Sequence, residues 1–253
     1  MSAVASVAAE DPAGAASALR RDGAVLVENV WPIAAIDMVR ATVLGQHPEF
    51  ENVEALEDWL GDKEERFIAP VALTEALRAT GVLDTPALDA ICAAALGEEF
   101  VFEAFGILMP RRGAKAQGAH RDGGFLFPDA TIDPILPPSA LTIAIPLVDI
   151  DLDNAPTGIA VGSHKLKPGS SDAPLAAVPA PRGSAIVWDF RTLHGGLANT
   201  SDRGRPALYF TACRPFWIDH RNFRDTARAK LVGDAATIAA LGPRYIRAQA
   251  MQR

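Results

Sequence analysis

The sequence predicts a mostly β protein with flanking helices, in which antiparallel strands form a sandwich or a barrel. Helical periodicity dominates up to Gly97 and returns in the tail, whereas the region between reads as short strands separated by Gly, Pro, Asn and Asp clusters. A block of strands after a block of helices disfavours a doubly wound parallel sheet, where the two alternate. The chain contains neither repeats nor a low-complexity linker, so residues 1–253 are expected to form one domain.

The first part of the chain supplies most of the expected helices. Pro32 suits the first turn of a helix, where a missing amide hydrogen costs nothing, and Gly97 suits a helix end. Residues 1–14 are expected to be loosely ordered. The expected elements are a helix over 15–21, a strand from Ala24, a helix after Trp31, an acidic helical face over 49–65, and helices over 71–79 and 86–96.

Runs of β-branched and aromatic residues predict the strands of the second part. Residues 219–253 return to a helical pattern and are expected to pack outside the sheet as a C-terminal helical segment. The expected strands cover 100–109, an H-x-D motif near residue 120, 140–149, 158–161, 183–190 and 205–213.

Composition and charge narrow the choice of partners and compartment. Lys and Arg total 24 against 31 Asp and Glu, a net charge of −7, and no basic run is interleaved with aromatic residues, which argues against nucleic acid. The N-terminus lacks a signal-peptide pattern, and no apolar run approaches the length of a membrane span. We expect a soluble, cytoplasmic protein without a membrane partner, whose Cys92 and Cys213 are buried thiols.

The segment G-A-H-R-D-G-G from Gly118 offers two ligands to a metal. In an extended backbone His120 and Asp122 project to the same side. His194, in L-H-G-G, is the best candidate for a third ligand. Two imidazoles and one carboxylate on one face of an ion leave its other positions open, which favours non-haem iron chemistry over a structural site. An H-x-D pattern alone is weak, so its context matters.

That context includes an arginine eleven residues beyond His194. Arg205 begins the β-prone run R-P-A-L-Y-F-T-A, where a guanidinium can hold the far carboxylate of a diacid cosubstrate through two parallel hydrogen bonds. Arg203 is the competing candidate, but it lies in the turn S-D-R-G. We favour Arg205.

From about Arg21 to Trp217 the chain resembles the phytanoyl-CoA dioxygenase-like family of iron(II)- and 2-oxoglutarate-dependent oxygenases. Five motifs occur in the order of that family, and together they are specific. They are R-D-G-A-V-L-V-E-N-V-W, H-R-D-G, A-L-T-I-A-I-P-L-V-D, N-A-P-T-G-I-A-V-G-S-H-K and R-G-S-A-I-V-W-D-F-R-T-L-H-G-G-L-A-N-T-S-D-R-G-R-P-A-L.

The resemblance implies a double-stranded β-helix core, a cupin-like jelly roll with helices against one sheet. It also implies Fe(II), 2-oxoglutarate and O₂ as cofactor and cosubstrates. In the matched positions, His120, Asp122 and His194 would bind iron, and Arg205 would pair with the terminal carboxylate of 2-oxoglutarate. Thr142 would place a hydroxyl beside that carboxylate, and Gln117 would reach the cosubstrate or the substrate, or else serve turn packing.

The reaction implied is hydroxylation of a C–H bond with release of succinate and CO₂, or a related desaturation or ring closure. Halogenating relatives resemble this pattern with a small residue in place of the carboxylate, so Asp122 favours hydroxylation. His164, in V-G-S-H-K, is expected to stabilise a turn. His47, followed by Pro48, is expected to end a helix, and His220 has no partner at metal-ligand spacing.

The substrate is expected to be a small molecule, and nothing in the sequence marks a coenzyme A site. Two segments resemble loops over a barrel mouth, residues 125–139 and residues 214–224. Two other functions fit part of the pattern. One is a zinc-dependent hydrolase, which would gain nothing from Arg205. The other is a non-catalytic jelly-roll protein that binds or senses a metal.

Overall fold

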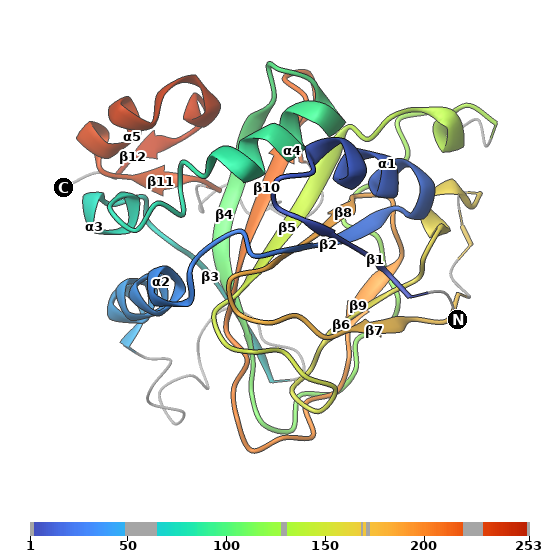
Figure 1. The fold of residues 1–253 in the computed structure, drawn as a ribbon, viewed down its shortest axis with the longest axis horizontal. Helices are drawn as coiled ribbons and strands as arrows, with labels where there is room; N and C mark the ends of the chain where they lie inside the picture. The colour runs from blue at the N-terminus through green and yellow to red at the C-terminus, as the bar shows by residue number, and fades with distance from the viewer. Residues whose placement is uncertain are drawn as a thin grey trace.

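A seven-stranded sheet forms the main layer of the protein (Figure 1). The computed structural model describes residues 3–48, 65–127, 131–167, 169–170, 173–219 and 230–251. All neighbouring strands of the main sheet are antiparallel except β1 and β2, which are parallel. In spatial order its strands are β1 (Ala5–Ala8), β2 (Ala24–Glu28), β8 (Ala185–Asp189), β5 (Ala140–Pro146), β10 (Ala207–Cys213), β4 (Val101–Pro110) and β3 (Arg66–Pro70).

A second, three-stranded antiparallel sheet faces part of the main sheet. It has the order β7 (Ala176–Val178), β6 (Thr157–Ile159), β9 (His194–Gly196). A cavity lies between the two sheets, because its walls come from β3, β4, β5, β8 and β10 on one side and from β6 and β9 on the other. Strands thus provide the frame for the candidate site.

Helices cover the opposite face of the main sheet (Figure 1). The larger hydrophobic core lies there, where Leu19, Ile36 and Ile91 are packed in one cluster with Ile143 and Phe210. The helices are α1 (Pro12–Asp22), α2 (Ile33–Gln46), α3 (Glu75–Arg78), α4 (Pro86–Leu96) and α5 (Ala235–Leu241), with 3₁₀ turns η3 (Asp133–Ile135), η4 (Ser163–Lys165) and η5 (Gly242–Tyr245).

The alternation of side chains along β5 explains how one sheet serves both the core and the cavity. Successive residues of a strand point to opposite faces. Leu141, Ile143 and Ile145 accordingly belong to the helix-side core, whereas Thr142 lines the cavity and Ala144 belongs to a smaller cluster on the other side. Fully buried strands of this kind place a few polar residues toward the site without exposing the core.

The beginning of the chain differs from the expected loose order. Ala5–Ala8 form β1, which pairs in parallel with β2, and Ser6 Oγ donates a hydrogen bond to Glu28 at 2.6 Å. Asp11 caps α1 by accepting from the Gly14 amide at 2.8 Å. Pairing with β2 makes β1 the edge strand of the sheet and supplies the backbone partners that hold this terminus.

Several other elements also differ from expectation. Strand β3 was not anticipated, although Phe67 and Ala69 alternate into the core. The helix expected over 71–79 is reduced to α3, and the 219–253 segment contains, besides α5, the short parallel pair β11 (Val232–Gly233) and β12 (Gln249–Ala250). The acidic face expected over 49–65 lies outside the described residues except for Glu65.

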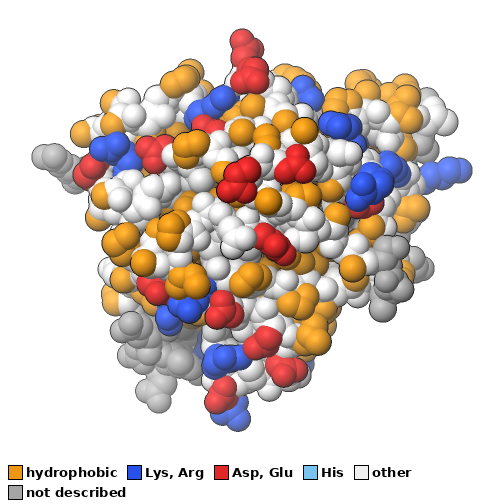
Figure 2. Space-filling view, in the orientation of Figure 1, with side chains coloured by type: hydrophobic (Ala, Val, Ile, Leu, Met, Phe, Trp, Pro, Cys, Tyr) orange, Lys and Arg blue, Asp and Glu red, His pale blue; other side chains and the backbone are white. Residues whose placement is uncertain are grey.

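Surface and thiol chemistry follow the composition. On the face in Figure 2, Lys and Arg side chains are scattered among Asp, Glu and apolar side chains. Cys92 and Cys213 are both buried and unpaired, as predicted. None of the helices in the described ranges has the length and apolar character that crossing a membrane requires.

Candidate metal centre and its cavity

The three candidate ligands meet at one wall of the cavity between the sheets, which measures about 450 Å³. One ligand atom from each of His120, Asp122 and His194 lies within 4.8 Å of the other two. His194 begins β9, while His120 and Asp122 come from the loop at 118–124. His194 is 6% exposed and His120 is exposed, so the cluster reaches from the interior to the surface.

The H-x-D motif was expected to be a strand, but it is a loop that makes a single β-bridge. The His120 amide donates to the His194 carbonyl, and the His194 amide donates to the His120 carbonyl, both at 2.9 Å. Glycines at 118, 123 and 124 flank the motif and weaken regular strand structure there. The bridge nevertheless places the two imidazoles side by side, with ring centroids 4.5 Å apart.

Hydrogen bonds fix the tautomer of both imidazoles. The Nδ1 atom of His120 lies 3.0 Å from the Gly118 carbonyl oxygen, and that of His194 lies 3.0 Å from the Thr192 carbonyl oxygen. A carbonyl only accepts, so Nδ1 carries the hydrogen, and the Nε2 lone pair of each neutral ring remains for a metal. His194 Nε2 lies 3.4 Å from Asp122 Oδ1.

Asp122 is oriented by two donors from the main sheet. Thr142 Oγ1 donates to Asp122 Oδ2 at 2.5 Å, and Trp188 Nε1 donates to the same oxygen at 3.0 Å. The other oxygen, Oδ1, faces His194. Thr142 was expected beside a cosubstrate carboxylate, whereas its hydroxyl contacts the Asp122 carboxylate. It therefore orients a candidate ligand.

The electrostatics of the cluster favour an ionised carboxylate. Burial alone would raise the pKa of Asp122, but the two imidazoles and the Thr142 hydroxyl lower it to about 2. Burial would lower the pKa of His194, and Asp122 raises it above its ordinary value. For His120, burial and the neighbouring His194 lower the pKa. The Asp122 carboxylate thus stabilises positive charge on the buried imidazole of His194.

Arg205 lies in the same cavity and Arg203 does not. Arg205 precedes β10, is only 1% exposed and directs Nη1 toward the Tyr209 hydroxyl at 3.4 Å. Within the described ranges, its buried Nε has no hydrogen-bond partner. Arg203 is exposed and forms an ion pair with Asp151 at 2.7 Å. A buried cation with an unused donor is a costly arrangement unless an anion binds there.

Gln117 is occupied by the backbone of β9. The side-chain oxygen Oε1 of Gln117 accepts from the Gly196 backbone amide at 2.9 Å, and the backbone amide of Gln117 donates to the Gly196 carbonyl at 2.8 Å. Gln117 also lines the cavity. Of the two roles weighed for this residue, its contacts favour packing that supports His194 two residues earlier.

Two residues of the site were not anticipated. Trp188 donates a hydrogen bond to Asp122. Side chains alternate along β8, so a residue next to Val187, which packs in the helix-side core, is expected to face the cavity. Arg66, on the edge strand β3, lines the cavity and is only 4% exposed. Its Nη2 donates to the carbonyls of Lys115, Gly196 and Leu197 at 2.5, 3.1 and 2.7 Å. No motif in the sequence marks Arg66.

The remaining histidines lie elsewhere. His164 is buried, with Nε2 3.2 Å from the Arg20 carbonyl oxygen, and so connects η4 to α1. His47 lies at the end of α2, where its Nε2 is 2.8 Å from the Pro70 carbonyl oxygen. His220 lies outside the described residues.

Comparison with known sequences gives a family match over most of the chain. Residues 19–207 match the family described as phytanoyl-CoA dioxygenase. One curated relative, the dioxygenase olcK of Penicillium canescens, is 27% identical over 223 residues, which cover 83% of this chain and 73% of that protein.

Solved structures with the same fold include two with TM-scores near 0.6. EvdMO1 has a TM-score of 0.61 and 23% identity over 81% of this chain, which spans half the length of that protein. The carbocyclase SnoK from nogalamycin biosynthesis, described as non-haem and α-ketoglutarate-dependent, has a TM-score of 0.58 and 20% identity, covering 79% of this chain and 83% of its own. These likenesses confirm the expected fold class.

Proposed function

Since the chain belongs to the phytanoyl-CoA dioxygenase family, we propose that it is a non-haem iron(II)- and 2-oxoglutarate-dependent dioxygenase that hydroxylates a C–H bond of a small molecule. The observation that carries the proposal is the convergence of His120, Asp122 and His194 on one wall of a cavity that also holds a buried arginine. Succinate and CO₂ are the expected coproducts.

The donor set fits iron(II). Two imidazole Nε2 atoms and one carboxylate oxygen are the ligands of the non-haem iron oxygenases that bind metal on one face. The Nδ1 hydrogen bonds of His120 and His194 orient both rings, as the outer contacts of metal-bound histidines do. When bound, the iron would supply positions for a keto acid and for dioxygen, and hence the oxidising chemistry.

Arg205 supplies the charge that a dicarboxylate needs. A guanidinium can bind a carboxylate with two parallel hydrogen bonds. Tyr209 Oη, 3.4 Å from Nη1, offers a further donor at the same end of the cavity. We therefore assign the anchoring of the far carboxylate of 2-oxoglutarate to Arg205. The exposed ion pair of Arg203 with Asp151 disfavours Arg203 for this role.

The substrate would occupy the part of the cavity that the cosubstrate leaves open. Small or apolar residues of β3 and β4 line part of the cavity, among them Ile68, Pro70, Ala104 and Leu108. Such walls suit an uncharged C–H-bearing portion of a molecule, because they exclude water without offering hydrogen bonds. Asp122 would supply a carboxylate ligand, and we therefore propose hydroxylation over halogenation.

The test uses metal-free protein, to which Fe(II), 2-oxoglutarate and ascorbate are added. Without oxygen, 2-oxoglutarate should produce a visible charge-transfer band in the wild type and not in Asp122→Ala. In air, succinate should form, and Arg203→Ala should behave as the wild type. Tight zinc retention without 2-oxoglutarate binding would indicate a hydrolase instead. Weak binding of both metal and cosubstrate would indicate a non-catalytic protein.

A further inference from the structure

Arg121 lies between the two candidate ligands of the H-x-D motif and donates hydrogen bonds to two other segments, residues 163–170 and the backbone at Arg191. Its Nε donates to the Arg191 carbonyl at 2.7 Å, and its Nη1 donates to the Ser170 carbonyl at 2.8 Å. Nη2 is 3.3 Å from the Ser163 carbonyl oxygen. The guanidinium also lies over the Phe125 ring, 5.3 Å from its centre. One side chain thereby fixes the 118–124 loop from outside the cavity.

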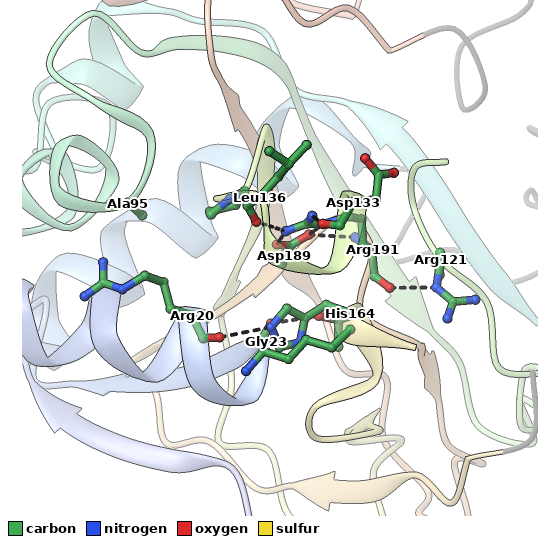
Figure 3. A network of polar contacts seen from close by, with 12 residues as sticks. Arg20, Gly23, Ala95, Arg121, Asp133, Leu136, His164, Asp189 and Arg191 are labelled. Carbon is green, nitrogen blue, oxygen red and sulfur yellow. Dashed lines mark hydrogen bonds and ion pairs between the residues drawn. The ribbon is translucent and has the colours of Figure 1, made fainter. Parts of the chain in front are cut away.

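Arg191 continues this connection (Figure 3). Its guanidinium binds the Asp189 carboxylate through Nε at 3.0 Å and Nη2 at 2.6 Å, where both side chains are buried. The other contacts of the same guanidinium reach a different segment, because Nη1 donates to the Asp133 carbonyl at 2.5 Å and Nη2 to the Leu136 carbonyl at 3.1 Å. These two carbonyls belong to residues 131–139, which lead directly into β5.

The backbone around Arg191 belongs to the candidate site. Phe190 lines the cavity, and its carbonyl accepts from the Gly123 amide at 3.1 Å. The Thr192 carbonyl accepts from His194 Nδ1. Movement of residues 190–193 would therefore disturb both the H-x-D loop and the third ligand.

From these contacts we infer that Arg121 and Arg191 act together as positioning residues. They hold the candidate metal ligands in a fixed position relative to the 131–139 segment. The inference rests on the proposed function only in taking His120, Asp122 and His194 as the metal ligands. The bidentate contact with Asp189 uses only two of the five N–H donors of Arg191. The remaining donors of Arg191 extend to 131–139, and its carbonyl extends to Arg121.

The connection predicts an effect on metal binding from residues that offer no ligand atom. Outer contacts of metal ligands typically change metal affinity by 10- to 100-fold. Arg121→Gln and Arg191→Gln should each weaken Co(II) binding about tenfold, measured by the visible absorption of the bound ion. The double variant should lose about as much as one single variant, because two residues in one chain of contacts are not additive. Arg203→Gln, which changes an exposed arginine, is the matched control.

A second readout separates positioning from general stability. Hydrogen exchange of the 131–139 segment should accelerate in Arg121→Gln, although the hydrogen bonds of Arg121 in the described structure go to Arg191, Ser170 and Ser163 and not to that segment. Arg191→Lys retains a charge opposite Asp189 but cannot reproduce all four contacts, so it should fold and bind Co(II) with intermediate affinity. This variant keeps the test decisive if Arg191→Gln does not fold.

Two results would overturn the inference: a 100-fold loss in the double variant, which is the product of independent effects, or unchanged exchange of 131–139 in Arg121→Gln. Failure of the wild type to bind Co(II) would instead contradict the proposed metal site itself. The two failures are therefore distinguishable in one titration series.

Discussion

The backbones of His120 and His194 face each other across an antiparallel bridge and exchange two hydrogen bonds of 2.9 Å. Main-chain pairing therefore sets the positions of the two rings, although His120 and His194 lie 74 positions apart in the sequence. In such a hydrogen-bonded pair the side chains leave the same face of the two strands. Removal of either imidazole should leave this pairing intact.

The first prediction follows from that independence. His194→Ala should abolish Co(II) binding, since one of three ligands is lost, while the thermal unfolding midpoint stays within a few degrees because the bridge is retained. His47→Ala removes a histidine outside the cavity and should bind Co(II) as the wild type does. Wild-type affinity in His194→Ala would eliminate this residue as a ligand.

The two neighbouring arginines should differ sharply in cosubstrate binding. Arg205→Ala should weaken 2-oxoglutarate binding to the metal-loaded protein by roughly 100-fold, because a charge-assisted bidentate contact is lost. Arg203→Ala should have no effect, since its guanidinium pairs with Asp151 at the surface. Calorimetric titration of the Ni(II)-loaded variants measures both. Equal affinities would transfer the anchoring role to another group.

The two donors to Asp122 should matter for metal affinity. Thr142→Val removes a 2.5 Å hydrogen bond to Oδ2 and should raise the pKa of the carboxyl from about 2, while weakening Co(II) binding about tenfold. Trp188→Phe should act in the same direction, since it removes the second donor. Thr211→Val is the control, because Thr211 faces Thr142 across the sheet and lines the same cavity. A larger effect at Thr211 would contradict this assignment.

The metal-free protein should lose stability as the pH rises above 6.5. Burial would lower the pKa of His194, but Asp122 raises it above the ordinary value of 6.5. A histidine with a higher pKa in the folded chain stabilises fully below 6.5, and this contribution is lost as the pH rises through the folded value. The pKa values of His120 and His164 are lowered, so those residues titrate below this window.

Denaturant unfolding of the metal-free wild type should therefore show a free energy that declines from pH 6.5 upward, and His194→Gln should lack this decline. The slope is at most about 1.4 kcal/mol per pH unit for a single group. An identical decline in the variant would assign it to another titrating residue.

Residue patterns were sufficient for the parts of the site that depend on strand alternation. The apolar residues at 141, 143 and 145 predict which way Thr142 faces, and the run beginning at Arg205 predicts its place before β10. Arg203 and Arg205 were separated by their local context, since Arg203 lies in a turn and is exposed, whereas Arg205 leads into β10 and is buried. These inferences need only local periodicity.

Contacts between distant segments could not be predicted in this way. Arg66 donates a hydrogen bond to the Gly196 carbonyl, 130 positions later, and no local pattern indicates that approach. The hydrogen bond from Thr142 to Asp122 likewise depends on how the loop crosses the sheet. Strand β1 was missed because four small residues acquire a strand conformation only by pairing with β2.

The glycine after the L-H-G motif supplies the final prediction. A Cβ atom on Gly196 would lie 2.7 Å from Arg66 Nη1 and 3.0 Å from Gln117 Oε1. Arg66 cannot easily withdraw, because three backbone carbonyls hold its Nη2. Gly196→Ala should thus lower the free energy of unfolding by about 1–3 kcal/mol through overpacking and should weaken Co(II) binding, since β9 also carries His194.

A matched control is available in the loop that pairs with this strand. An added Cβ on Gly118 would meet nothing within 4 Å, so Gly118→Ala should change neither the unfolding free energy nor Co(II) binding appreciably. Thermal unfolding and Co(II) titration of both variants test the prediction. If Gly196→Ala matched Gly118→Ala in both measurements, the site would have accommodated the added methyl group without displacing Arg66. The close approach of Arg66 to β9 would then not be a determinant of the site.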